Sequence, residues 1–384
     1  MSEPTNAPNA SGLPRPGAER HEHTVRQCVK YSFFKVDSAF RRLPDMKQAD
    51  LKLELIRTIR DFDRRMLLRP YSLVGLRGDV DFLLWQVAEE IDAFNDLAKA
   101  VYSTGMGAYL TMPYSFLAMT RKSIYDIGVP DEGDEADRLI IQPGDGKFLF
   151  VYPFVKTRQW YALPLDERQR IMNEHIRIGR KYPQIKLNTT YSFGLDDQEF
   201  VVAFEGEHPS DFLDLVMELR DTESSRYTLR DTPTFTCINM SLPDVLDSLG
   251  GAQVADQAGP DASIQQGWVQ TLSVTELPSG SSAKVYLGSQ QVALFNVAGT
   301  IYALNNRCPH ARGPLCDGKV HAESGGPSVT CPWHKADFDL ATGTAIDGPT
   351  RAPVQNYAVK IGANGFIYIA DLAFADMDLV ETLA

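Results

Sequence analysis

The spacing of apolar residues divides the chain into two regions of different texture. In the first, short apolar runs typical of strands alternate with segments whose apolar residues recur at helical spacing. Strands are predicted at 31–37, 68–78 and 147–157, helices at about 47–65, 81–104, 165–182 and 209–227, and a hairpin at 188–205. These elements form two similar halves and predict an α+β fold with helices on one face of the sheets.

The second region, residues 266–372, has short alternating runs separated by Gly, Ser and Asn turns, which predicts a small all-β domain. Residues 244–265 are rich in Gly, Ala, Asp and Gln without an apolar period, so we expect a linker between this domain and a first domain at 25–243. The Pro-, Ala- and Asn-rich residues 1–24 are predicted to be disordered, and 373–384 form a C-terminal tail.

The net charge of −12 argues against nucleic acid or an anionic membrane as a partner, because no basic surplus exists to neutralise phosphates. No apolar run approaches the length of a membrane span. Five cysteines in so long a chain do not indicate a disulfide scaffold, and the N-terminus lacks a secretory signal. We therefore expect a cytoplasmic protein.

Two short motifs in the all-β region carry metal-ligand chemistry. Cys308-Pro-His310 and Cys331-Pro-Trp-His334 each lie in a predicted loop. Thiolate and imidazole together suit zinc or an iron–sulfur cluster, so a structural Cys₂His₂ zinc site is one interpretation.

The two motifs, together with Gly313-Pro314-Leu315 and the return strand at 338–343, resemble the Rieske ferredoxins over about the last 110 residues. The resemblance implies a [2Fe–2S] cluster in which Cys308 and Cys331 bind one iron and His310 and His334 the other. Gly313 and Trp333 stand where respiratory Rieske subunits carry clamp cysteines, and Ala336 offers no hydroxyl to the cluster. These departures favour a low-potential, ferredoxin-type module. Cys316 lies in the first of the two loops without an evident partner, and we expect no role for it.

In the first region, His175 is the histidine whose surroundings suggest a ligand. It shares one face of its predicted helix with Ile171, Ile178 and Tyr182, so we expect it to face the core. A neutral imidazole in such a place is either a satisfied core histidine or a haem-iron ligand.

The runs YPFVKTRQWYALPLDERQRIMNEHIRIGRKYPQI, TTYSFGLDDQEFVVAFE and ELRDTESSRY resemble the chlorite dismutase superfamily, and most closely its coproheme decarboxylases. The resemblance covers about 215 residues. It implies two ferredoxin-like halves per subunit, a homo-oligomer that is commonly a pentamer, and haem or iron-coproporphyrin as the bound cofactor.

Position by position, the resemblance implies a set of site residues. His175 would be the proximal iron ligand, and Glu223 the carboxylate partner of its other ring nitrogen. Tyr152 would be the redox-active tyrosine beside a propionate of the porphyrin. Trp160 would lie next to that propionate. The side chains implied near the propionate carboxylates are Lys156, Arg220 and Ser225.

Two ways of counting give different residues at the distal position. Counting back from Gly194 indicates Leu187, whereas counting forward from His175 indicates Asn188. Neither is the arginine that chlorite dismutases use to stabilise an oxyanion at the iron, so chlorite chemistry is disfavoured. No histidine between Asp131 and Lys147 is available as a base.

We therefore expect oxidative decarboxylation of iron-coproporphyrin III to haem b. The oxidant would be peroxide, or oxygen with electrons from the Rieske domain, whose own electron donor is unidentified. The alternatives are a haem monooxygenase, a peroxidase or a chlorite dismutase-like enzyme reduced by its own Rieske domain, or a non-catalytic haem sensor.

Overall fold

The first domain repeats one βαββαβ order in two halves. The computed structural model describes residues 26–370 except 64, 126–139, 142, 145, 255–263, 266–267, 288–289, 324–325 and 363–364, so the predicted disordered N-terminus and C-terminal tail lie outside the described residues. The first half comprises β1 (Cys28–Val36), η1 (Phe40–Arg42), α1 (Asp45–Arg60), β2 (Leu67–Ser72), β3 (Phe82–Ala88), α2 (Asp92–Ser103), η2 (Met106–Tyr109) and β4 (Leu110–Met119). The second comprises β5 (Phe148–Lys156), α3 (Arg158–Ala162), α4 (Leu165–Gly179), β6 (Lys186–Tyr191), β7 (Phe200–Gly206), α5 (Pro209–Arg220), η4 (Glu223–Tyr227), β8 (Thr228–Arg230), β9 (Phe235–Asn239) and α6 (Leu242–Ser248).

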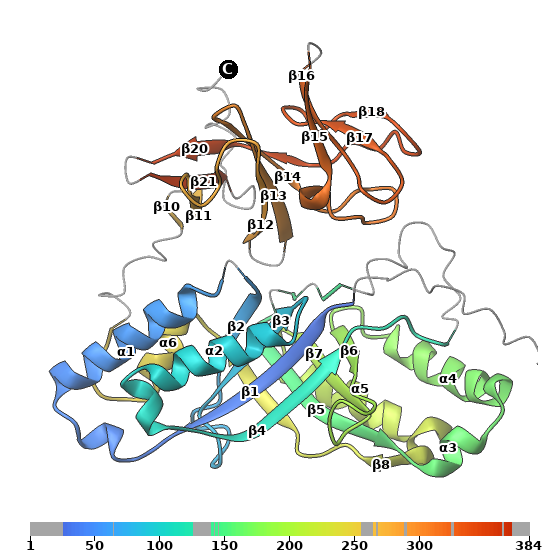
Figure 1. Ribbon diagram of the computed structural model, residues 1–384. Coiled ribbons are helices and arrows are strands. Elements are labelled where there is room, and N and C mark those ends of the chain that lie inside the picture. The colour runs from blue at the N-terminus through green and yellow to red at the C-terminus, as the bar shows by residue number, and fades with distance from the viewer. Residues whose placement is uncertain are drawn as a thin grey trace, which may run out of the picture.

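The two halves share one closed sheet (Figure 1). Its strand order is β7-β6-β4-β1-β3-β2-β9-β5-β8, and β5 also pairs with β7, so the sheet closes into a barrel with β8 at its edge. Tyr31, Phe33 and Val151 point into the mainly apolar interior. Helices α1, α2 and α6 cover the outer face of the first half, and α4 and α5 that of the second. This arrangement confirms the α+β class with two ferredoxin-like halves.

The helix predicted at 81–104 is wrong in its first part. Phe82–Ala88 form β3, with every side chain buried, and α2 begins only at Asp92. Strand β3 lies between β1 and β2 and is covered on both faces. A strand buried on both faces is a continuous apolar run, which periodicity does not distinguish from a buried helix.

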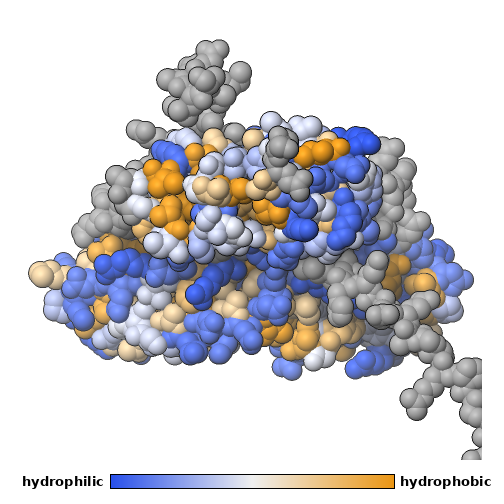
Figure 2. All heavy atoms as spheres, turned by 45° about the horizontal axis from the view of Figure 1, so that its top comes forward, coloured by the Kyte–Doolittle hydropathy of each residue, from blue (hydrophilic) through white to orange (hydrophobic). Residues whose placement is uncertain are grey.

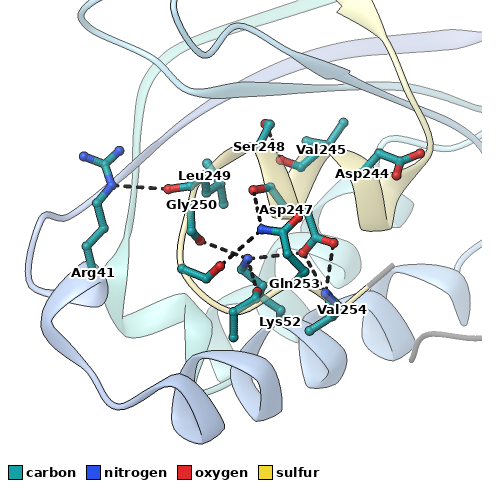
Figure 3. Close-up of polar contacts among 12 residues, drawn as sticks. Arg41, Lys52, Asp244, Val245, Asp247, Ser248, Leu249, Gly250, Gln253 and Val254 are labelled. Atoms are coloured by element: carbon teal, nitrogen blue, oxygen red, sulfur yellow. Dashed lines mark hydrogen bonds and ion pairs between the residues drawn. The ribbon is translucent and has the colours of Figure 1, made fainter. Parts of the chain in front are cut away.

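The segment predicted as a linker at 244–265 is structured over its first part, which corrects the domain boundary. Helix α6 ends at Ser248, and the chain then folds back onto α1 and reaches the fully buried Val254. Lys52 of α1 holds this segment, because its Nζ donates to Asp247 Oδ1 at 3.3 Å and to the carbonyl oxygens of Gly250 and Ala252 at 3.1 and 2.7 Å (Figure 3). The Lys52 side chain has no exposed area, so these contacts replace its hydration.

The C-terminal domain is all-β in its described part, as predicted. Its elements are β10 (Ile264–Gln265), β11 (Trp268–Ser273), β12 (Ser282–Leu287), β13 (Gln290–Val297), β14 (Thr300–Asn305), η5 (Leu315–Asp317), β15 (Lys319–Glu323), β16 (Gly326–Thr330), β17 (Asp337–Asp339), β18 (Ala345–Asp347), β19 (Asn356–Tyr357), β20 (Val359–Ile361) and β21 (Phe366–Ala370). They form three sheets, ordered β10-β11-β21-β20, β12-β13-β14-β19 and β15-β16-β17-β18. Across the described part of the chain, no helix is both long and apolar enough to cross a membrane.

Replacing Lys52 by Met should destabilise the first domain by roughly 3 kcal/mol, because it leaves the buried Asp247 carboxylate without its cation. Denaturant unfolding would measure the loss, and hydrogen exchange should rise over residues 249–254. Lys47→Met, an exposed position on the same helix, is the matched control. Equal stability of the two variants would show that Lys52 does not hold this segment.

Candidate functional site

Several of the predicted site residues line one groove on the outer face of the barrel. The groove lies between β5, α4 and α5 and encloses about 110 Å³. Its lining side chains are Tyr152, Phe154, Lys156, His175, Phe212, Val216, Leu219, Arg220, Ser224, Ser225, Thr228, Asp231 and Thr234. Because ligand pockets typically enclose roughly 300–1,000 Å³, a large planar ligand would have to displace lining side chains. The exposed side chain of Arg220 can be displaced in this way if its ion pair with Asp231 is broken.

His175 has the properties of a metal ligand. Its Nδ1 atom is buried and has no hydrogen-bond partner among the residues that the structure describes. Burial, with a smaller contribution from the positive charge of Lys156, lowers the pKa of His175 to about 4. The imidazole is therefore neutral, which is the form that binds iron.

The predicted hydrogen bond between Glu223 and His175 is not formed at Nδ1. Arg170, one turn before His175 on α4, donates to Glu223 Oε2 at 2.8 Å and also to Glu167 at 2.7 Å. The Glu223 carboxylate is therefore paired with Arg170 and not with Nδ1 of the imidazole. The sequence did not indicate Arg170, because its partner is 53 residues away.

Lys156 lies inside the groove wall. Its Nζ donates to the carbonyl and hydroxyl oxygens of Ser224, each at 3.0 Å, and lies 4.5 Å from the centroid of the Trp160 ring. Burial lowers the pKa of Lys156 to about 8. Trp160 is buried behind Lys156 and packs against Tyr227, so it supports the lysine and is not among the described lining residues.

At the other end of the groove, Arg220 donates to Asp231 Oδ2 at 2.6 Å. Ser225 Oγ donates to the Arg220 carbonyl at 2.7 Å and helps to hold this turn. Burial and the charge of Asp231 both raise the pKa of Tyr152, so its hydroxyl is protonated at neutral pH. Asp231 was not predicted, since it belongs to no recognisable motif.

The strand register distinguishes the two candidates for the distal position. Leu187 opposes Phe204 across the β6–β7 pairing, and Tyr152 stacks on Phe204 from the same side, with ring centroids 6.1 Å apart. Leu187 therefore shares the outer face with Tyr152. Asn188 points into the barrel, where its Nδ2 donates to Glu205 at 2.9 Å.

The two cysteine–histidine loops of the C-terminal domain have the same backbone geometry. In each, the N–H of the cysteine, Cys308 or Cys331, donates to the carbonyl five residues later, and its carbonyl accepts from the N–H four residues later. That fourth residue is basic and has a positive φ, 64° at Arg312 and 62° at Lys335. Both loops have the same order of residues: a cysteine, a proline, any two residues, a basic residue and a small residue. This repeat is a sequence signal for the shared loop geometry, which the spacing of the ligands alone does not contain.

The four donors separate into two pairs. The sulfurs of Cys308 and Cys331 are buried, and a Cβ at Gly313 would come within 2.8 Å of the Cys331 sulfur. The imidazoles of His310 and His334 are exposed, with ring centroids 4.8 Å apart. No three His, Cys, Asp or Glu side chains in the described part are placed to share one metal ion, as a zinc site would need. The arrangement fits a two-iron cluster.

The two thiols of the sulfur pair differ in protonation, because their shared hydrogen bond raises the pKa of Cys308 and lowers the pKa of Cys331. A hydrogen bond from the Cys308 thiol, followed by backbone N–H groups of its own loop, lowers the pKa of Cys331 to about 6. Thiolate is the form that binds iron. In contrast, burial and the neighbouring Asp317 raise the pKa of Cys316 to about 12, which suits an unreactive thiol.

Comparison with known proteins finds a matching family model for each of the two domains. Residues 48–240 match the family model described as chlorite dismutase, and 267–370 match a Rieske-like [2Fe–2S] domain. A coproheme decarboxylase of Mycolicibacterium smegmatis is 31% identical over 194 residues, covering 49% of this chain and 79% of that protein. One of Staphylococcus carnosus is 30% identical over 216 residues, covering 51% and 84%.

Solved structures show the same fold for the first domain. A chlorite dismutase from Candidatus Nitrospira defluvii has a TM-score of 0.53 at 24% identity, covering 58% of this chain and 94% of that one. A haem-binding protein from Thermus thermophilus has a TM-score of 0.51 at 23% identity, with the same coverage of 58% and 94%.

Replacing His175 by Ala should weaken haem binding by at least roughly tenfold, because the iron loses its protein ligand. An absorption titration with haem measures this loss, and added imidazole should restore the lost spectrum. His208→Ala, an exposed position before α5, is the control. A variant at His175 that binds haem with an unchanged spectrum would exclude this histidine as the ligand.

Replacing Cys331 by Ser should abolish the iron–sulfur cluster, because one of its two buried sulfurs is lost. Iron and sulfide analysis and the electron paramagnetic resonance signal of the reduced protein would show the loss. The Cys316→Ser protein should keep a full cluster. Loss of the cluster in both variants, or in neither, would contradict the assignment of ligands.

Proposed function

Since the chain belongs to the chlorite dismutase family and carries a Rieske-like [2Fe–2S] domain, we propose that it decarboxylates iron-coproporphyrin III to haem b with peroxide as the oxidant. The observation that carries this proposal is that His175, Tyr152 and the cations Lys156 and Arg220 line one groove. A donor for iron, a redox-active phenol and two carboxylate-binding groups are what this reaction requires.

The cofactor and the chain's own residues would have separate tasks. The iron of the bound iron-coproporphyrin, held by His175, would supply the oxidising chemistry. Lys156 and Arg220 would bind substrate carboxylates through charge-assisted hydrogen bonds. For Arg220 this means exchanging Asp231 for the substrate. Tyr152, protonated and facing the groove, would give up its phenolic hydrogen and take one from the propionate.

The reaction balances with peroxide alone. Each propionate that becomes a vinyl group releases one carbon dioxide, one proton and two electrons. One peroxide accepts the two electrons with two protons and becomes two waters. The Rieske-like domain is then a one-electron carrier that reduces the iron or supports oxygen as an alternative oxidant.

A second candidate is a haem monooxygenase or peroxidase that receives electrons from its own cluster. The Rieske-like domain favours it, because a monooxygenase needs electrons that decarboxylation with peroxide does not. Leu187 on the outer face provides no donor for a distal oxyanion. Chlorite decomposition is disfavoured for this reason.

Replacing Tyr152 by Phe should remove decarboxylation almost completely, by at least about a hundredfold, while haem binding remains. Mass spectrometry of the porphyrin after incubation with iron-coproporphyrin and peroxide would detect the loss of two carbon dioxide units in the unmodified protein. Tyr161→Phe, whose hydroxyl donates to Glu199 away from the groove, is the control. Peroxidase turnover without decarboxylation in the unmodified protein would support the second candidate instead.

A further inference from the structure

The carboxylate of Glu89, directly after β3 in the haem domain, contacts the Rieske-like domain of the same chain. One oxygen forms an ion pair with Lys284 of β12, and the other accepts from Gln291 of β13 at 3.3 Å. The side chains of Glu89 and Lys284 are only 31% and 24% exposed, so solvent screens this pair less than a surface pair. Figure 2 shows the Rieske-like domain lying against the haem domain, with hydrophilic residues along their boundary.

The Glu89 contact continues by hydrogen bonds to the base of a cluster loop. Gln291 Oε1 accepts from Asn306 Nδ2 at 3.2 Å, and the fully buried Asn306 accepts from the N–H of Cys316 at 2.8 Å. Asn306 stands two residues before the cluster ligand Cys308. A path of side-chain contacts therefore connects a carboxylate of the haem domain to the loop that holds the cluster.

A cavity of about 250 Å³ lies at the same boundary, lined by Glu89 from one domain and by Lys284, Arg307 and Asp317 from the other. Within the described part of the chain, the buried Nη2 of Arg307 has no hydrogen-bond partner. Burial lowers the pKa of Arg307, and the charge of Glu89 opposes this effect. Glu89 is therefore the carboxylate that compensates two cations of the Rieske-like domain.

The number of residues between the domains limits how far the Rieske-like domain can move from the haem domain of its own chain. Lys52 and Asp247 fix the end of the haem domain as far as Val254 (Figure 3). Ten Cα–Cα steps join residue 254 to residue 264, so the connection spans at most ~35 Å. A tether of this length gives a high effective concentration, so a modest polar contact suffices for docking.

We propose that Glu89 is the docking residue that holds the Rieske-like domain on the haem domain of its own chain, through Lys284, Gln291 and Arg307. This proposal rests on the proposed function only for the purpose of the docking. That purpose is to keep the loop that binds the cluster beside the haem domain, which the cluster would reduce. The contact itself is independent of decarboxylation.

Charge reversal tests this docking. Glu89→Lys and Lys284→Glu should each release the domain, and the double variant should restore docking in part because the pair is re-formed with opposite signs. Hydrogen exchange in the cluster-loaded full chain should rise roughly tenfold over β12 and the end of β3 in the single variants. In the double variant it should fall clearly below the single variants without reaching the original value, because Arg307 still lacks its carboxylate.

The control is Glu90→Lys, an exposed neighbour for which no contact with the second domain is found among the described residues, and it should leave exchange unchanged. At about 1 M salt, where the Debye length falls to about 3 Å, the unmodified protein should approach the single variants. The proposal is overturned if exchange does not respond to either single reversal, or if the double variant stays as unprotected as the singles. Because exchange is measured without porphyrin, a failure of decarboxylation would leave this result unaffected.

Discussion

Closure of the nine-stranded sheet into a barrel is the constraint on which the rest of the structure depends. Because β5 pairs with β7 and β9, one face of these strands is committed to the barrel interior. That interior is filled mainly by apolar side chains such as Phe33 and Phe235, whose rings stack at 4.0 Å. A cofactor site therefore has to form on the outer face, where α4 and α5 leave the groove that contains Tyr152 and His175.

Burial in the groove sets the protonation states of three side chains. Burial keeps His175 neutral and Tyr152 protonated, and it lowers the pKa of Lys156, which a bound carboxylate would raise again. Arg220 is paired with Asp231 before any ligand arrives, so binding of an anion must compete with that carboxylate.

The sequence predicted what depends on local patterns and on motifs. It predicted the α+β class, the all-β second domain and both cysteine–histidine loops. It failed where long-range contacts decide the structure. Strand β3 was predicted to be helical because both of its faces are buried, which leaves no period-2 pattern. The segment before Val254 was predicted to be a linker because its anchor, Lys52, is about 200 residues away in the sequence. Glu89 and Asp231 had no local signal at all, since their partners come from other segments.

Anchoring of the segment before Val254 also changes how the two domains relate. Lys52 anchors the chain as far as Val254, and Glu89 contacts the Rieske-like domain, so side-chain contacts as well as the chain itself join the two domains. The sulfurs of Cys308 and Cys331 are buried and the imidazoles of His310 and His334 are exposed, so the histidine side of this site faces solvent.

The most direct test of this account is rapid-mixing spectroscopy of the protein loaded with haem and cluster, under anaerobic conditions with limiting reductant. The account predicts that the reduced cluster is reoxidised as the haem iron is reduced, with a rate constant that does not depend on protein concentration. Haem that stays oxidised beside a reduced cluster, or a rate that rises in proportion to concentration, would contradict it.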